Sequence, residues 1–470
     1  MTSRRCPVLA SGTLALALSA CVSLPESVLG RSVGADLAIP VRFAAPSAAA
    51  VPADGPEGGS EGGSGITSGL LSLFDAPALK TLVTRAQARN PDLRLAAARL
   101  EEAGFTADAS HGRRLPVLTA GFAGSRGRDG NRRTAGDYSP SLDVSWEVDL
   151  WGRLRDEHGA LEAGAAAQAE TVRAAQDSIA ARVMQTWFDA LTAQKQLHLE
   201  RARTANLTKI AASNRLNYQA GLAVLEDLTA VERDIETSRA VEADRLAARN
   251  RQVRTLQVLL GDYPAGGLAL SADLPEMLPA PPAGLPAAVM SARPDLRAAW
   301  QRVVSADSGV KAAHKARLPR LTLTGTLGRQ NADFSKLLSG ATIWSLAAGL
   351  SAPLFDSGRL ENEMKAAQSR AEQAWIAYLG TALTAFQEVE RALDNETLLA
   401  ERETRQQAAV RHAVDTADLF ESRYRNGLVS ILDLLTAQNA VFDLKNGLLT
   451  VRNERAKNRV ALALALGLGV

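Results

Sequence analysis

The sequence predicts a mainly helical fold with a small β part, in which long antiparallel coiled-coil helices carry four strands. Three observations predict it: proline-free helical stretches, runs that alternate apolar with polar residues, and an internal repeat of the sequence. Of 470 residues, 46% are hydrophobic but only 4% are aromatic, and 36 are glycine. Small side chains of this kind favour closely spaced helices over a large enzyme-like core.

The charge balance argues against a nucleic-acid partner. The formal net charge is +2, and removing residues 1–20, whose charges are Arg4 and Arg5, leaves a chain of zero formal charge. A polyanion needs a basic surface, which this balance does not indicate. The two cysteines, Cys6 and Cys21, lie so close to the N-terminus that no disulfide framework is expected in the folded body.

Residues 1–20 are predicted to be a signal peptide. Two arginines precede an apolar run from Val8 to Leu18, which is shorter than the about 20 residues that a membrane-spanning helix needs. The run ends in Leu-Ser-Ala-Cys at 18–21, which is similar to the bacterial lipoprotein box. Cys21 would then be the acylated N-terminus, and Val22 after it favours the outer membrane. The alternative is an ordinary signal that ends in a chance cysteine.

Residues 21–74 are predicted to be the lipidated N-terminus and a flexible tether rich in glycine, serine and proline. Residues 54–65 read Asp-Gly-Pro-Glu-Gly-Gly-Ser-Glu-Gly-Gly-Ser-Gly, which offers little to bury. We expect no site in its Pro-, Ala-, Gly- and Ser-rich part from Ala44 to Gly69.

Residues 75–265 and 285–470 are predicted to be two structural repeats, joined by a Pro-rich linker at 266–284. Short motifs recur in the same order in both. Asn-Pro-Asp-Leu-Arg at 90–94 returns as Arg-Pro-Asp-Leu-Arg at 293–297, and Tyr-Gln-Ala-Gly-Leu at 218–222 returns as Tyr-Arg-Asn-Gly-Leu at 424–428. Self-similarity at a long, nearly constant spacing is typical of a duplicated architecture.

Each repeat is predicted to hold one helix of ordinary length, two short strands and two long helices. In the first repeat the helix runs from Ala76 to about Ala109. Apolar residues at positions 142, 144, 146, 148 and 150 alternate with polar ones. This is the pattern of a strand with one apolar face and one face exposed to water. Leucines at 321, 323 and 327 and the apolar series 344–350 predict the strands of the second repeat. Four strands per chain follow.

The long helices are expected to pack as coiled coils. No proline occurs from Arg155 to Tyr218, so a rise of about 1.5 Å per residue gives a rod of roughly 90 Å. Apolar residues from Ile376 to Leu393 step by three or four, which is the coiled-coil spacing. The Ala-rich helix faces have too few bulky residues to form a hydrophobic core within one chain. They are instead suited to close packing against neighbouring helices. An extended cytosolic coiled coil is the alternative, against which the signal peptide and the strands argue.

The strand count predicts an oligomer. A four-stranded sheet with an apolar face belongs either to a soluble sandwich or to a membrane barrel, and Trp146, Trp151 and Trp344 lie in or beside strands as interfacial aromatics do. In hydrocarbon an open sheet edge is too costly, and about eight strands are the minimum for a closed barrel. The chain must then complete its barrel with copies of itself.

The arrangement resembles the bacterial outer-membrane efflux factors of the TolC type, and within them the lipidated NodT-like branch. The resemblance extends from about Leu79 to Leu468, and its most specific motif is Tyr-Arg-Asn-Gly-Leu-Val-Ser-Ile-Leu-Asp-Leu-Leu-Thr-Ala-Gln at 424–438. It implies a homotrimer in which twelve strands form one β-barrel in the outer membrane. The long helices would form a trimeric α-barrel tunnel in the periplasm.

The resemblance also implies a passive function. Substrates such as drugs or other small molecules would pass from an inner-membrane transporter of the RND class, through a periplasmic adaptor protein, into this channel and out of the cell. Two alternatives remain: the exit duct of a type I protein secretion system, and a lipid-anchored periplasmic scaffold that does not conduct. No cofactor or metal is expected.

The residues of the helix-turn-helix tips follow from the same resemblance. Gly221 and Leu222 in the first repeat match the turn at the periplasmic end of the tunnel, and Gly427, Leu428 and Val429 match the second turn. In the family these tips contact the adaptor. Glycine suits such a reversal because the turn often needs a positive φ.

A periplasmic aperture and gate are predicted beside the tips. Asp433 matches a carboxylate of the narrow aperture, and Asp227 with Tyr424 resembles a bonded pair that holds the tunnel shut. Val429 stands where some members have a basic residue, and Thr436 where a second acid occurs. Asp433 either lines the constriction or is an ordinary solvated helix residue. Three copies around an axis would favour cations.

Enzyme chemistry is not expected. The five histidines are scattered singly, and no His-Glu-x-x-His, Gly-x-Ser-x-Gly, P-loop or dinucleotide motif occurs. The sequence therefore predicts a protein without catalytic residues.

Overall fold

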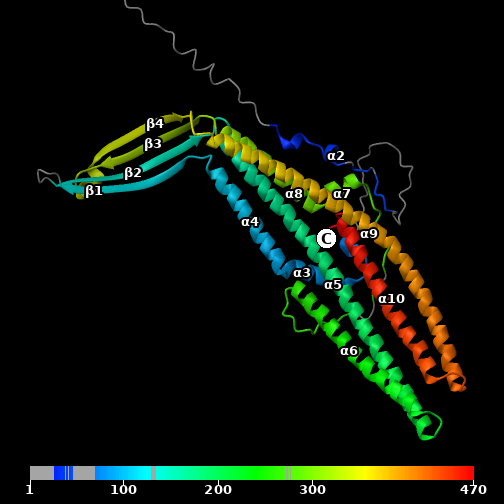
Figure 1. Ribbon diagram of the computed structural model, residues 1–470. Helices are drawn as coiled ribbons and strands as arrows, with labels where there is room; N and C mark the ends of the chain where they lie inside the picture. Colours follow the sequence, from blue (N-terminus) through cyan, green and yellow to red (C-terminus); the bar gives the residue numbers. More distant parts are fainter. Residues whose placement is uncertain are drawn as a thin grey trace, which may run out of the picture. The chain divides into compact units, whose positions relative to one another are not determined.

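The computed structural model describes residues 26–37, 39–40, 42–45, 69–128, 134–270, 274–275 and 277–469. Within these ranges the chain is mainly helical with one four-stranded antiparallel sheet (Figure 1), which confirms the predicted fold class. The helices are α2 Val33–Asp36, α3 Pro77–Arg89, α4 Pro91–Gly112, α5 Arg153–Gln219, α6 Leu225–Leu259, α7 Pro286–Ala292, α8 Pro294–Lys315, α9 Arg359–Arg425 and α10 Ile431–Ala465. The strands are β1 Val117–Arg128, β2 Thr134–Val148, β3 Arg320–Gln330 and β4 Ala341–Ser351, and the short 3₁₀ helices are η1 Val28–Gly30, η2 Leu70–Ser72 and η3 Phe334–Ser339.

The chain divides into two compact units, each drawn from both halves of the sequence. The sheet unit contains the described residues within 26–36, 101–167 and 299–378, and the helical unit contains those within 37–100, 168–298 and 379–470. The order of elements is doubled, since two helices, two strands and two long helices follow one another twice. The compact units therefore cut across the duplicated order.

The sheet has the strand order β1-β2-β3-β4. Leu142 pairs with Leu327, and Leu327 pairs with Trp344, so these apolar side chains share one face. The strands have 11 to 15 residues and are longer than the short strands that the sequence predicts. The reason is that small and polar residues between the apolar runs continue the same ladder, which a hydrophobic pattern does not reveal.

The helix predicted from Ala76 to Ala109 is wrong, because the chain breaks at Pro91. Asn90 is extended (φ −60°, ψ 128°), and its side-chain oxygen accepts hydrogen bonds from the next two free backbone N–H groups at 2.9 and 3.2 Å. Arg293 makes the same break before Pro294 in the second half. A residue before proline is pushed away from helical angles, and the proline then fits the first helical turn.

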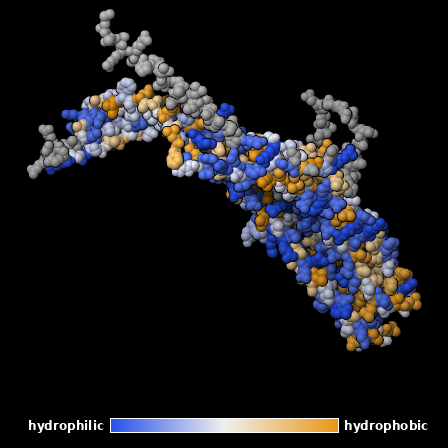
Figure 2. Space-filling view, turned by 45° about the horizontal axis from the view of Figure 1, so that its top comes forward, coloured by the Kyte–Doolittle hydropathy of each residue, from blue (hydrophilic) through white to orange (hydrophobic). Residues whose placement is uncertain are grey.

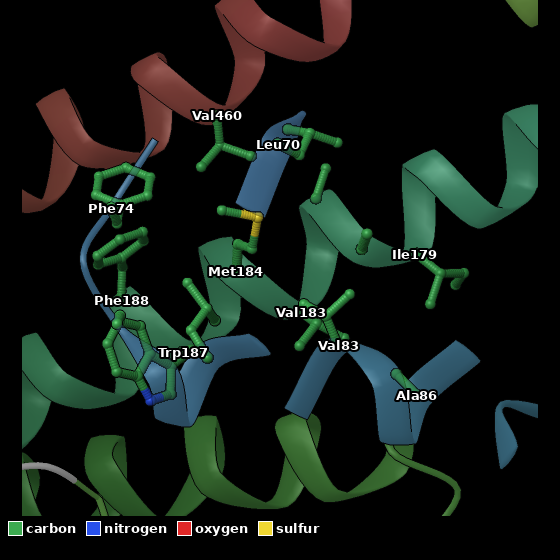
Figure 3. Close-up of a cluster of buried hydrophobic side chains, with 14 of the residues drawn as sticks. Leu70, Phe74, Val83, Ala86, Ile179, Val183, Met184, Trp187, Phe188 and Val460 are labelled. Carbon is green, nitrogen blue, oxygen red and sulfur yellow. The ribbon is translucent and has the colours of Figure 1, made fainter. Parts of the chain in front are cut away.

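The core of the helical unit corrects the expectation that its helices lack bulky buried residues (Figure 3). Trp187 and Phe188 of α5 are 2% and 1% exposed, and Phe74 packs on Phe188 with ring centroids 4.7 Å apart. Residues 70–86 cover this part of α5 and supply Leu70, Phe74 and Val83 to the cluster. The sequence pattern of the long helices misses this core because about a third of its buried residues come from the separate segment 70–86.

The buried stripe of α9 includes only part of the predicted coiled-coil series, in which Val389 and Leu393 are 0% and 2% exposed. Ile376 and Leu383 belong to the predicted series but are 58% and 53% exposed. Among the buried residues of α9 are Ala371, Trp375, Tyr378, Ala382, Ala385 and Val389. These residues also step by three or four, so periodicity alone could not choose between the two faces of α9.

Two described parts of the N-terminal segment lie against helices. In the sheet unit, Asp36 accepts a hydrogen bond from the indole N–H of Trp375 at 2.8 Å. In the helical unit, the carboxylate of Glu390 accepts the backbone N–H groups of Ala44 and Ala45 at 2.7 and 2.8 Å. These contacts fasten the segment that follows the predicted lipidation site.

Candidate functional site

Two glycines reverse the chain between the long helices. Gly221 joins α5 to α6 and Gly427 joins α9 to α10, with φ of +73° and +71°. Each glycine N–H donates to the carbonyl three residues earlier, at 3.0 and 2.9 Å. The N–H of the following leucine donates to the carbonyl five residues earlier, at 2.8 and 2.9 Å. This is the Schellman arrangement, and the two predicted tips therefore share one backbone geometry.

The two turns expose apolar side chains. Leu222 is 80% exposed and Leu428 is 72% exposed, and Val224, Leu225 and Leu432 beside them are each at least half exposed. The space-filling view has hydrophobic colour at the end of the long helices that carries the turns (Figure 2). Val429 is half-buried instead. Leucines this exposed contribute little to the fold and leave the turns free to contact a partner.

Asp433 caps the start of α10. Its carboxylate accepts the hydroxyl of Ser430 at 2.6 Å and the backbone N–H of Ser430 at 3.0 Å, while the Ser430 hydroxyl oxygen accepts the N–H of Asp433 at 3.2 Å. This reciprocal pattern is a capping box. The hydrogen bond from the Ser430 hydroxyl is the main reason that the pKa of Asp433 is lowered. Asp433 stays exposed to solvent.

Tyr424 of α9 interacts with two residues of the first helix pair, Asn217 of α5 and Asp227 of α6. Burial raises the pKa of the Tyr424 phenol, a hydrogen bond with the Asn217 side chain lowers it, and the negative charge of Asp227 raises it. The hydrogen bond of Tyr424 is thus with Asn217, which the sequence alone did not identify. Asp227 acts on Tyr424 through its charge.

An apolar cluster beneath the turns joins the two helix pairs. Tyr424 packs on this cluster, to which α5, α6 and α10 contribute buried residues. Its buried members are Leu207, Ala211, Val231, Ile235, Ile431, Leu434 and Leu435. A movement that separates the two turns has to pull this cluster apart.

Polar contacts between α5 and α10 were not predicted from the sequence. Arg203 donates to the side-chain oxygen of Asn439 at 2.9 Å, and Asn206 donates to that of Gln438 at 2.8 Å. Amide and guanidinium groups occur on many helix faces, so nothing in their spacing marks them. Only the pairing of α5 with α10 identifies them as an interface that a rearrangement would have to break.

The sheet presents an apolar face without cover in the single chain. Trp344, Leu346 and Leu350 of β4 are between 69% and 78% exposed, and Leu118 of β1 is 66% exposed. On the opposite face, the carboxylate of Asp143 accepts hydrogen bonds from two hydroxyl groups at 2.7 Å. In the described residues β1 pairs with β2 alone and β4 with β3 alone, so each has an open edge. An open edge has unpaired backbone N–H and C=O groups, and exposed leucines place apolar surface in water. Both features favour binding of a partner.

All five histidines lie in the described residues. No three His, Cys, Asp or Glu side chains are grouped there so that they could hold a metal ion. His158 contacts the carbonyl of Ala107 at 3.1 Å and the carboxylate of Glu162 at 3.2 Å, next to the ring of His111. These contacts link α4 to α5 in the sheet unit.

No helix in the described ranges combines the length and the apolar character that crossing a membrane requires. The predicted lipidation residue, Cys21, and the predicted signal peptide lie outside the described residues. Their roles remain predictions.

Comparison with known proteins adds independent support. A family model described as outer membrane efflux protein matches residues 82–262 and 285–468. The probable outer membrane lipoprotein SilC of Salmonella typhimurium is 28% identical over 406 residues, which cover 86% of this chain and 88% of SilC. The outer membrane protein OprJ of Pseudomonas aeruginosa is 30% identical over 402 residues, with 83% of this chain and 84% of OprJ covered.

A solved structure shares the fold. The open state of the MtrE outer membrane channel of Neisseria gonorrhoeae has a TM-score of 0.77 and 27% sequence identity to this chain, and the match covers 83% of this chain and 89% of MtrE. The two ranges that the family model matches correspond to the two halves of the doubled element order. The chain therefore belongs to the outer membrane efflux protein family.

Proposed function

We propose that this chain is the outer-membrane channel component of a tripartite efflux system. The observation that carries the proposal is a four-stranded sheet with an exposed apolar face and two open edges, on a chain whose long helices end in turns with exposed leucines. Family membership supports it. The channel conducts passively, so it needs neither a catalytic site nor a cofactor, and it is not an enzyme.

The open edges support a homotrimer. Four strands are too few to close a barrel, for which about eight are needed, so copies of the chain must combine. The family supports three copies, which supply twelve strands. Cyclic symmetry pairs β1 of one copy with β4 of the next, which satisfies both edges at once. The apolar face then faces lipid and the face with Asp143 lines the lumen.

The turns are proposed to contact a periplasmic adaptor protein. Leu222 and Leu428 offer the apolar contact, with Gly221, Gly427 and Val429 in the same turns. An adaptor that binds the turns better when they are apart shifts the channel toward an open state. The inner-membrane component of the same system is proposed to be a pump of the RND class, which supplies the energy for transport.

The gate is proposed to consist of the groups beside these turns. Tyr424, with Asn217 and Asp227, joins the two helix pairs of one copy. Asp433 is proposed to line the aperture in three copies, as a ring of negative charge that favours cations. Cys21 is proposed to carry acyl chains that hold the N-terminus in the outer membrane.

Channel formation is tested on the full chain, purified from membranes in detergent. We expect a trimer that dissociates on heating and gives stepwise ion conductance in planar lipid bilayers. A monomer without conductance, with tryptophan fluorescence typical of water, would contradict the proposal.

Adaptor contact is tested separately in cells that lack the gene and carry variants on a plasmid. Leu222→Asp with Leu428→Asp should leave the trimer and its conductance intact but abolish resistance to the exported compounds, screened among drugs, dyes, metals and solvents. Leu95→Asp is the matched control, because Leu95 is 51% exposed on α4, away from the turns. Full resistance in the double variant would argue against the adaptor contact.

A further inference from the structure

The two faces of the sheet carry opposite charges. Direct partners in the ladder share a face, and the apolar face that holds Leu142 and Leu327 also holds Arg126, Arg128 and Arg329. No acidic residue lies on that face in the described strands. The opposite face holds the strand acids Asp137, Asp143 and Glu147, and the base Arg320.

The three arginines lie near the strand ends that are remote from the helices of the sheet unit. β1 follows α4 at Val117 and ends at Arg128, and β3 follows α8 at Arg320 and ends one residue after Arg329 (Figure 1). All three side chains are exposed. None of them has a hydrogen-bond or ion-pair partner among the described residues. Within the described residues, these three cations therefore have no counter-charge on the apolar face.

An aromatic cluster on the same face separates the leucines from the outermost arginines. The ring of Phe334 in η3 meets Phe122 of β1 and Tyr138 of β2 edge to face, with centroids 6.3 and 5.4 Å apart. Arg126 follows Phe122 by four residues, which is about 13 Å along a strand. Aromatic girdles mark the lipid–water interface of membrane barrels. For Arg126 and Arg128, the order leucine, aromatic, arginine then matches hydrocarbon, interface and headgroup layer. Arg329 lies level with Phe122, at the interface.

We propose that Arg126, Arg128 and Arg329 bind phosphate groups of the phosphorylated glycolipid in the outer leaflet. The planar guanidinium group donates two parallel hydrogen bonds to a phosphate, and such charge-assisted bonds are the strong ones. Acids on the same face would compete for the arginines, and the described strands place their acids on the other face. The proposal rests on the proposed insertion of the sheet into the outer membrane, and it adds a lipid that the barrel recognises.

The test uses the full-length trimer in detergent and native mass spectrometry. Diphosphoryl lipid A is titrated into the protein. The comparison probe is monophosphoryl lipid A, which lacks one of the two phosphates. We expect the diphosphoryl form to bind at least about tenfold more tightly, since it offers the arginines a second phosphate group for charge-assisted hydrogen bonds. Equal binding of the two lipids would overturn the proposal.

A triple variant locates the site. Arg126→Gln, Arg128→Gln and Arg329→Gln together should weaken diphosphoryl lipid binding by about 10-fold or more. The control replaces Arg173, Arg239 and Arg405 by Gln, which removes the same charge from helix surfaces where each arginine is more than half exposed. Equal losses in both triple variants would mean that net charge alone attracts the lipid, and the site would be rejected.

Two readouts keep this inference separate from the channel itself. Conductance of the unaltered trimer is recorded on the same preparation, and its absence counts against the proposed function. Conductance together with equal binding of the two lipids rejects the phosphate site alone. If the triple variant fails to assemble, the comparison of the two lipids on the unaltered protein still decides.

Discussion

Ser430 and Asp433 cap the start of α10 reciprocally, and the equivalent pair in the first half of the chain cannot do so. At the start of α6 the cap position is Val224, which has no polar side chain, and no side-chain cap is formed there. Asp227 occupies the place of Asp433. Two turns with the same backbone thus use equivalent carboxylates differently, since Asp433 binds its own helix and Asp227 acts on Tyr424.

Replacing the two capping residues one at a time separates helix capping from ion selectivity. Ser430→Ala removes a cap worth about 1 kcal/mol and keeps the carboxylate of Asp433. Asp433→Asn keeps a polar side chain but removes three negative charges from the trimer. We expect only Asp433→Asn to lower the cation-over-anion permeability ratio, by about twofold or more, as measured from reversal potentials in a KCl gradient. Equal ratios in all three proteins would show that Asp433 does not line the aperture.

The selectivity should be insensitive to mild acid. Hydrogen bonds from Ser430 favour the charged form of Asp433 and lower its pKa. Its stabilising contribution is therefore present above the usual aspartate value of about 3.9 and is lost only as the pH falls through the lower value of the folded protein. Reversal potentials at pH 7 and pH 5 should agree. A drop in selectivity between these two pH values would mean that another group carries it.

Removing the contacts of Tyr424 should open the channel. Tyr424→Phe with Asp227→Ala deletes the hydroxyl that bonds Asn217 and the charge beside it. We expect a higher single-channel conductance and greater sensitivity of cells to large antibiotics. Tyr218→Phe is the matched control, because Tyr218 is the equivalent tyrosine of the first half and is 42% exposed. Unchanged conductance in the double variant would argue against this gate.

A buried ion pair between α9 and α10 should matter for stability. Arg459 and Glu396 are 3% and 5% exposed, and Arg459 also donates to the carbonyl of Leu278. Glu396→Ala leaves a buried cation without its partner and should cost about 3–5 kcal/mol. The midpoint of thermal trimer dissociation should fall clearly. Glu401→Ala, in an exposed pair with Arg405 3.6 Å apart, should change it little. Similar shifts in both variants would contradict this assignment.

Lipidation at Cys21 should be separable from channel formation. Cys21→Ser removes the thiol that acylation needs, so the variant should incorporate no labelled palmitate. We expect the trimer of this variant to conduct as before once it is inserted, because the sheet supplies the membrane contact. Cys6→Ser is the control and should be labelled normally. Labelling of the Cys21 variant would place the modification elsewhere.

Much of the fold was predictable because its signals are local. The proline-free stretch from Arg155 to Tyr218 predicted α5, and the apolar spacing from Ile376 to Leu393 predicted part of α9. Strict alternation at 142–150 predicted the C-terminal half of β2, which ends at Val148. The glycines of the two turns were identifiable because a tight reversal requires positive φ at one position. Helix breaks at Asn90 and Arg293 could also have been predicted, since a proline follows each.

The sequence by itself determined the element types, their doubled order and the two turns, because each depends on residues a few positions apart. Only the tertiary structure decided which side of α9 is buried, that Tyr424 bonds Asn217, and that the arginines and acids of the strands lie on opposite faces. Those choices depend on the register between strands and on contacts between helices far apart in the chain. Periodicity shows that a helix or strand has two faces, and long-range packing selects the one that is buried.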